Sequence, residues 1–186
     1  PMDDYTGGHG TPVGGIVAAK MDNYIGIAGV APEAKIMALR AGTAGGYLEQ
    51  DDVAEAIIYG VQNGCKIINM SFGDYVYSHL LKEAVDYGTT RGVIFVASAG
   101  NSGNDRLQFP AAYDNTIAVG ATDWNNAVTG FSNYGSKIDV VAPGQNILST
   151  GTNNFYGEYS GTSFAAPQVA GVAALILADH ALWTND

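Results

Sequence analysis

Three short segments carry side chains that together could perform acyl transfer. His9 is flanked by glycines at the start of an expected helix, which leaves room for another group to reach its imidazole. Asn101 follows an apolar run, in a loop of small residues, and its side-chain N–H could donate to a developing oxyanion. Ser163 lies at the start of the last apolar helical pattern, where backbone N–H groups favour negative charge. A base, an amide donor and a helix-start hydroxyl are the parts of an acyl-transfer site.

Each of these side chains also has a purely structural interpretation. A lone histidine at a helix start is commonly exposed to water, and Asn101 could belong to an ordinary polar turn after a strand. Thr162 or Ser163 could serve as the N-cap of the following helix, because hydroxyl side chains are preferred there. Taken singly, the segments leave these alternatives open, and only their combination favours chemistry.

Two enzyme classes are disfavoured by spacing and order. The sequence around Ser163 reads G-x-S-x-A with the histidine earlier in the chain, whereas an α/β-hydrolase has G-x-S-x-G with the histidine last. The loop around Asn101 lacks the G-x-G-x-x-G spacing of a dinucleotide-binding loop. A dinucleotide-binding domain is therefore suggested only by the alternation of strands and helices.

The elements that must position these residues alternate between short apolar runs and helical patterns. Helices are predicted at 50–63, 77–91 and about 163–180, and strands at 35–40, 65–70, 93–98, 116–121 and 138–142. Such alternation predicts an α/β fold with a mostly parallel central sheet and helices on both faces. Ligands in these folds bind beyond the carboxyl ends of the strands, so the loops after Met70 and Ser98 are the first candidates. With no repeat or linker, residues 1–186 are interpreted as one domain.

The composition narrows the class of partner. Of the 186 residues, 47% are hydrophobic and 14% are charged, which predicts a globular domain rather than disorder. A formal net charge of −10 argues against nucleic acid or an anionic membrane as the main partner. The single cysteine, Cys65, allows no intramolecular disulfide. The solidly apolar run at 169–178 is too short to span a bilayer and predicts a buried core helix.

In combination and in order, the three segments resemble those of the subtilisin-like serine proteases, the subtilase family. The resemblance rests on His-Gly-Thr at 9–11, Ser-Ala-Gly-Asn at 98–101 and Gly-Thr-Ser-Phe-Ala-Ala-Pro at 161–167. Further family-like segments lie at 27–32, 69–73 and 141–144, so the match extends over nearly the whole chain. It implies the three-layer subtilisin-like fold.

The resemblance implies a serine endopeptidase whose partners are peptide or protein substrates. Ser163 Oγ would attack the scissile carbonyl, and His9 would take the proton and pass it to the leaving amine. The Asn101 side chain and the Ser163 backbone N–H would hold the oxyanion. No cofactor is required for this chemistry, and the family implies an extracellular location.

The resemblance also assigns two walls to the pocket that receives the substrate residue before the scissile bond, the first specificity pocket. These walls are Ser71, Phe72 and Gly73 on one side and Ser98, Ala99 and Gly100 on the other. In the family, the segment equivalent to 71–73 pairs with the extended substrate as an added strand. Phe109-Pro110 falls where the family has a cis proline. The stretch 106–108 lacks the small residues expected of a pocket floor, so no preferred substrate side chain follows.

One part of the family pattern is missing. The aspartate of the triad belongs to an Asp-Thr-Gly or Asp-Ser-Gly motif well before the histidine, and only eight residues precede His9. Asp3 and Asp4 do not start that motif and are interpreted as solvated loop carboxylates. We therefore expect a subtilase catalytic domain without the N-terminal strand region that carries this aspartate and without the C-terminal end. A separate N-terminal segment or a pro-region is a candidate partner, and a catalytically impaired peptide-binding pseudo-protease is the alternative.

Calcium is the one metal that the resemblance suggests, in a structural role. Subtilases often bind it in the loop after the histidine helix, where Asp22 and Asn23 offer the oxygen ligands that calcium prefers. Asp123 is a candidate for a second, weaker site. An ordinary polar turn is the alternative interpretation at both places.

Overall fold

The computed structural model describes residues 8–180, 183 and 185. Its helices are α1 (Gly10–Ala18), α2 (Gln50–Gln62), α3 (His79–Thr89) and α4 (Thr162–Asp179). Its strands are β1 (Ile67–Met70), β2 (Ile94–Ser98), β3 (Ile117–Thr122), β4 (Val140–Pro143), β5 (Ile147–Thr150) and β6 (Tyr156–Tyr159).

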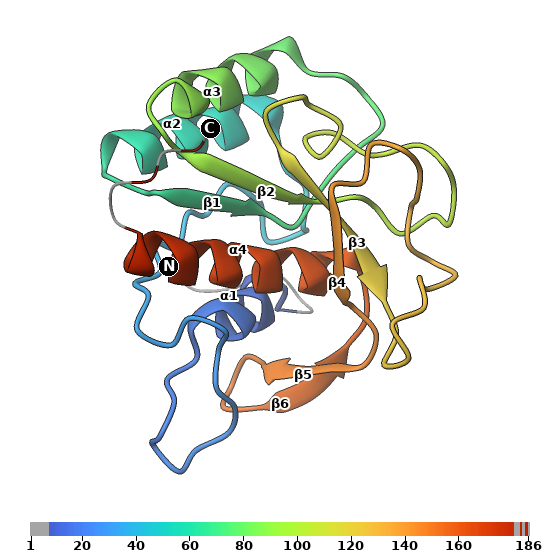
Figure 1. Cartoon of the computed structure of the whole chain (residues 1–186). Helices are drawn as coiled ribbons and strands as arrows, with labels where there is room; N and C mark the ends of the chain where they lie inside the picture. The colour runs from blue at the N-terminus through green and yellow to red at the C-terminus, as the bar shows by residue number, and fades with distance from the viewer. Residues whose placement is uncertain (1–7, 181–182, 184, 186) are drawn as a thin grey trace.

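The central sheet has four parallel strands in the order β1-β2-β3-β4. Val96 of β2 lies opposite Ile117 of β3, and Val119 of β3 lies opposite Val140 of β4. Figure 1 shows α2 and α3 on one face of this sheet and α4 and α1 on the other. The predicted α/β three-layer fold with a parallel sheet is thereby confirmed.

The core is divided into two parts by the alternation of side chains along β2. Phe95, 1% exposed, packs among residues of α2 and α3, whereas Val96, fully buried, packs among alanines of α4. Successive side chains of a strand point to opposite faces, so a strand covered on both faces needs apolar residues at consecutive positions. This requirement explains the unbroken apolar run that the sequence shows there.

Helix α4 lies against all four strands of the parallel sheet and against α1. By length and composition it is apolar enough to cross a membrane. Its small residues allow close packing: Ala165 and Ala166 are fully buried, and a Cβ added at Gly171 would lie 2.7 Å from Cβ of Val30. The first half of the helix, which carries Ser163 in its first turn, thus packs in the core of this fold. The prediction that the apolar run 169–178 is buried is wrong for most of that run: only Ala170 and Gly171 are buried in it, and Val172, Leu175 and Ile176 are 48%, 47% and 44% exposed.

The strand predicted at 35–40 is wrong. A strand needs a partner that completes its hydrogen-bond ladder, and within the described part of 31–49 the one pairing is the isolated bridge of Gly42 with Leu48. Ile36 and Met37, which suggested a buried run, are 52% and 39% exposed. Apolar composition without a neighbouring strand therefore left this segment irregular.

The antiparallel hairpin of β5 and β6 was missed by the sequence analysis. Its turn is closed by the N–H of Phe155, which donates to the carbonyl oxygen of Thr152, and the two central residues, Asn153 and Asn154, have φ of 56° and 60°. This is the conformation of a hairpin turn with two left-handed residues, which asparagine tolerates well. The Asn-Asn pair was the signal that could have revealed it.

Phe95 gives a direct test of the core. Phe95→Ala is expected to lower the free energy of unfolding by about 3–5 kcal/mol, because it removes a fully buried ring between β2, α2 and α3. Urea or thermal unfolding measures this loss. Phe155→Ala is the matched control, since that ring is 63% exposed, and its expected cost is under about 1 kcal/mol. Equal losses in the two variants would contradict this description of the core.

Candidate active site

His9 stands immediately before α1 as its N-cap residue, half-buried and without a side-chain capping bond. Its imidazole centroid lies 5.6 Å from the ring centroid of Phe164, the residue after Ser163. The hairpin holds α1 in this place, because Ser149 Oγ donates to the carbonyl oxygen of Pro12 at 2.7 Å. The fold thus brings the predicted base to the start of α4, although His9 and Ser163 are 154 positions apart in the sequence.

Ser163 lies in the first turn of α4, next to the end of β1. Its Oγ donates to the carbonyl oxygen of Ser71 at 3.2 Å, and Ser71 Oγ donates to the carbonyl oxygen of Ser163 at 2.8 Å. The N-cap of α4 is Gly161, which has no side-chain cap. Neither Thr162 nor Ser163 is therefore the N-cap of α4 that the structural alternative required.

The Asn101 carboxamide is fixed on the start of the same helix. Its Oδ1 accepts hydrogen bonds from the backbone N–H of Thr162 at 2.8 Å and from Thr162 Oγ1 at 2.9 Å. Thr162 Oγ1 in turn accepts from the N–H of Gly100 at 3.2 Å. Within the described part of the chain, no hydrogen bond uses Nδ2 of Asn101. Because the oxygen is held by α4, the amide N–H groups remain available to a ligand.

The two predicted walls lie at the carboxyl ends of neighbouring parallel strands. Ser71, Phe72 and Gly73 follow β1, and Ser98, Ala99 and Gly100 end or follow β2. Ser98 and Ala99 are buried, and Gly100 has a φ of 110°, which favours glycine. Among the described residues, the N–H groups of 72 and 73 donate to no other backbone group. That segment can therefore pair with an added strand.

Between these walls lies the side chain of Gln108, which the sequence analysis did not assign. A Cβ added at Gly73 would lie 2.8 Å from Gln108 Cβ, and one added at Gly100 would lie 2.9 Å from Gln108 Oε1. The Gln108 N–H donates to the carbonyl oxygen of Ala99, and the Phe109-Pro110 bond that follows is cis, as the resemblance implies. In the sequence, the one sign that this side chain enters the pocket is that glutamine is larger than the residues expected of a pocket floor.

A polar cluster lies beside the Asn101 loop and centres on the phenol of Tyr75. Asn104 Nδ2 and Asn133 Nδ2 each donate to Tyr75 Oη at 3.1 Å, and the Arg106 guanidinium stands 4.8 Å from the ring centroid. Hydrogen bonding, first with Ser102, lowers the pKa of the Tyr75 phenol, while burial opposes this shift. These contacts connect the Asn101 loop, through Asn104 and Arg106, to Tyr75 and Asn133.

The predicted calcium ligands do not assemble a site by themselves. Asn23 Oδ1 accepts from the N–H of Ile25 at 3.0 Å, and Asp123 Oδ1 closes a turn by accepting from the N–H groups of Asn125 and Ala127. In the described ranges, no group of three or more His, Cys, Asp or Glu side chains gathers. Calcium binds six to eight oxygens, so any site at Asp22 needs further ligands, and calcium stays a prediction.

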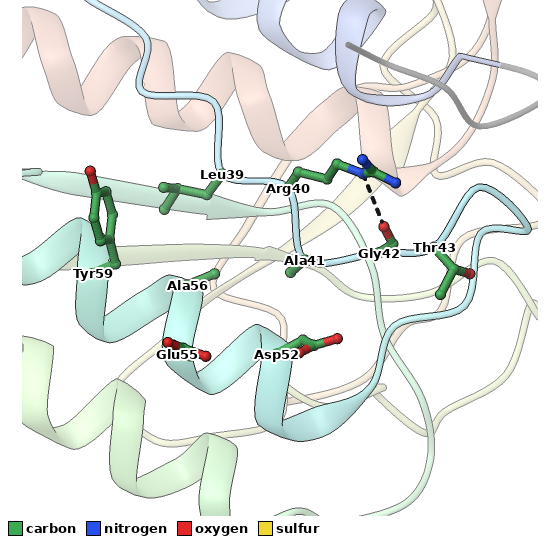
Figure 2. Close-up of a pocket in the computed structure, with 9 residues that line it drawn as sticks. All are labelled: Leu39, Arg40, Ala41, Gly42, Thr43, Asp52, Glu55, Ala56 and Tyr59. Carbon is green, nitrogen blue, oxygen red and sulfur yellow. Dashed lines mark hydrogen bonds between the residues drawn. The ribbon is translucent and has the colours of Figure 1, made fainter. Parts of the chain in front are cut away.

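A separate pocket lies between α2 and the segment 39–43 (Figure 2). Figure 2 shows Asp52 and Glu55 of α2 below this segment, and Arg40 Nε donating to the carbonyl oxygen of Gly42 at 3.3 Å. None of the predicted site residues lines it. Asp3 and Asp4, the two acidic residues that precede His9 and are interpreted as loop carboxylates, lie outside the described residues.

The fold and the site together define a class, the α/β proteins with a serine and histidine at the carboxyl ends of a parallel sheet. The chain belongs to the subtilase family. The model of that family, described as Peptidase S8, matches residues 2–186.

The relatives found by comparison agree with this membership. The chain is 48% identical over 176 residues to "Thermophilic serine proteinase" from Bacillus sp. (strain AK1), covering 95% of this chain and 43% of that protein. It is 43% identical over 178 residues to "Subtilisin Savinase" from Lederbergia lenta, covering 96% and 66%. The solved structure "Sphericase" superimposes with a TM-score of 0.89 at 34% identity, covering 97% and 66%. The chain thus spans 43% to 66% of the length of these relatives.

Proposed function

We propose that this chain is the part of a serine endopeptidase that carries its nucleophile, its base and its oxyanion asparagine. One observation carries the proposal: Asn101 Oδ1 is bound by two groups of Thr162, the residue directly before Ser163. That contact fixes a free amide donor beside a hydroxyl, which is the arrangement a tetrahedral intermediate requires. Membership of the subtilase family and the contact between His9 and Phe164 support it.

The proposed reaction is peptide-bond hydrolysis through an acyl-enzyme. The Ser163 hydroxyl, which now donates to the carbonyl oxygen of Ser71, gives its proton to His9 as Oγ bonds to the scissile carbonyl carbon. The Asn101 amide and the Ser163 backbone N–H stabilise the oxyanion, and His9 then passes the proton to the leaving amine. Water, deprotonated by His9 in the same way, releases the acyl group and restores the serine.

The substrate is proposed to be an extended peptide that pairs with the backbone of 71–73. The unpaired N–H groups of that segment support this mode, in which main-chain hydrogen bonds provide affinity and one pocket provides selectivity. An acid that orients His9 is proposed to come from residues outside those described, within a longer chain or a separate segment. An extracellular location is proposed from the family membership.

A fluorophosphonate probe tests the proposed function, because an activated serine displaces its fluoride and becomes phosphonylated. The full-length protein is expected to react at Ser163, as located by peptide mapping, and to hydrolyse a denatured protein substrate. Heat-denatured protein is the control for non-specific reaction. Binding of peptides without labelling or hydrolysis would contradict an endopeptidase and identify the peptide-binding pseudo-protease instead.

Gln108 allows a prediction about selectivity. Its side chain fills the space between Gly73 and Gly100, so substrates with a small residue before the scissile bond are expected to react fastest. Gln108→Gly is expected to raise kcat/KM for a phenylalanyl relative to an alanyl p-nitroanilide peptide by about 10-fold or more. Gln108→Met preserves the length of the side chain and is the matched control, expected to leave the ratio low. An unchanged ratio in Gln108→Gly would show that another group limits the pocket.

A further inference from the structure

Asn133 is buried, 1% exposed, and it contacts the Asn101 loop on both sides of Asn101. Its backbone N–H donates to the carbonyl oxygen of Gly100 at 2.9 Å, and its Oδ1 accepts from the N–H of Ser102 at 2.9 Å. Its Nδ2 donates to the carbonyl oxygen of Ala99 at 3.1 Å. Both neighbours of Asn101 are therefore bonded to Asn133: Gly100 to its backbone N–H and Ser102 to its side chain.

The same carboxamide connects this loop to the rest of the polar cluster. Nδ2 also contacts the carbonyl oxygen of Arg106 at 2.9 Å and Tyr75 Oη at 3.1 Å. A Cβ added at Gly100 would overlap Asn133 Nδ2, so the left-handed glycine is required by the approach of this amide. Asn101 itself is exposed, and its direction depends on how the loop around it is held.

We propose that Asn133 is a positioning residue for the reaction, which acts through the backbone of 99–102 to hold the Asn101 amide where the oxyanion forms. Two anchors then fix Asn101: Thr162 binds its side-chain oxygen, and Asn133 binds the backbone on either side of it. Oxyanion stabilisation depends on donors that are already in place, so a small displacement of the loop weakens it. This inference rests on the proposed endopeptidase function.

A double-mutant cycle in the full-length protein tests the assignment. Asn133→Ala is expected to lower kcat by about 10–100-fold with KM nearly unchanged. In an Asn101→Ala background the same substitution is expected to lower kcat no further, because the amide through which it acts is gone. A purely structural role predicts the same loss in both backgrounds, and that result would overturn the proposal.

Ser132→Ala is the matched control for the loss of a buried polar side chain in the same segment. Ser132 is also 1% exposed, but its Oγ accepts from the N–H of Ala121 in β3 and donates to the carbonyl oxygen of Asn133, with no bond to the loop 99–102. It is expected to leave kcat within about twofold. A loss in Ser132→Ala equal to that in Asn133→Ala would overturn the proposal. If the alanine variant does not fold, Asn133→Asp retains the acceptor for Ser102, loses the amide donors and is expected to show the same loss of kcat.

Hydrogen exchange gives a second readout that does not depend on hydrolysis. Asn133→Ala is expected to speed amide exchange in a peptide covering 99–104, whereas Ser132→Ala is not. Equal exchange in the two variants would overturn the positioning role whatever the activity. If Asn133→Ala speeds exchange but the parent protein neither hydrolyses peptides nor reacts with the fluorophosphonate, the contact of Asn133 with the loop is confirmed and the endopeptidase function is rejected.

Discussion

Ser163→Ala is expected to reduce both fluorophosphonate labelling and peptide hydrolysis to background. The substitution removes Oγ, the only protein atom that the proposed reaction bonds to the substrate. The fold should survive, because the main loss is the bond from Oγ to the carbonyl oxygen of Ser71, which is worth about 0.5–1.5 kcal/mol. Labelling, steady-state hydrolysis and thermal unfolding of the same preparation measure these effects together.

Ser160→Ala is the control for this experiment. Ser160 lies three residues earlier and is exposed, and its Oγ accepts from the N–H of Asn146 at 2.9 Å, so the same atom is removed outside the first turn of α4. It is expected to label and hydrolyse as the parent protein does. Labelling that persists in Ser163→Ala and disappears in Ser160→Ala would show that the nucleophile is not Ser163 and would refute the mechanism.

Asn101→Ala has the second largest expected effect. It is expected to lower kcat by about 10²–10³-fold, the magnitude known for removal of one such donor in subtilisin, a member of this family. KM should change little, because the amide acts on charge that develops only in the transition state. Steady-state kinetics on a peptide p-nitroanilide separates the two constants. A rise in KM with an unchanged kcat would show that Asn101 binds substrate rather than the oxyanion.

Two further variants separate the electrostatic role of Asn101 from its structural one. Asn101→Asp retains an oxygen that can accept from Thr162 but places negative charge where the oxyanion forms, so kcat should fall at least as far as in the alanine variant. Asn104→Ala truncates an amide in the same loop that bonds Tyr75 instead of α4, and it should retain most of the activity. Full activity in Asn101→Asp would contradict the oxyanion role.

The central sheet was predictable because it depends on patterns that are local along the chain. The apolar runs that form β2 and β3 are buried on both faces, and a strand in such a place needs consecutive apolar residues. The predicted helices likewise agree with α2 and α3, whose buried residues recur at helical spacing. The run at 35–40 has a similar composition and failed, because a ladder depends on a neighbour that its own residues do not specify.

His9, Asn101 and Ser163 could be selected from the sequence because each lies in a short motif of adjacent residues. What the motifs left open was whether the serine or threonine only caps α4, and the position of Gly161 as N-cap decided that question. The orientation of the Asn101 amide likewise depends on Thr162, 61 positions later. Ser71, in one wall of the pocket, accepts a hydrogen bond from Ser163, 92 positions later.

The sequence by itself therefore determined the family and the order of the motifs, on which the proposed chemistry rests, since both depend on residues that are neighbours along the chain. Only the tertiary structure decided that Gln108 lies between the two walls and that Asn133 binds both sides of Asn101. The physical reason is that such contacts join loops at the ends of different strands. Their distances are set by the order and register of the sheet and by the packing of α4 against it, which no local pattern encodes.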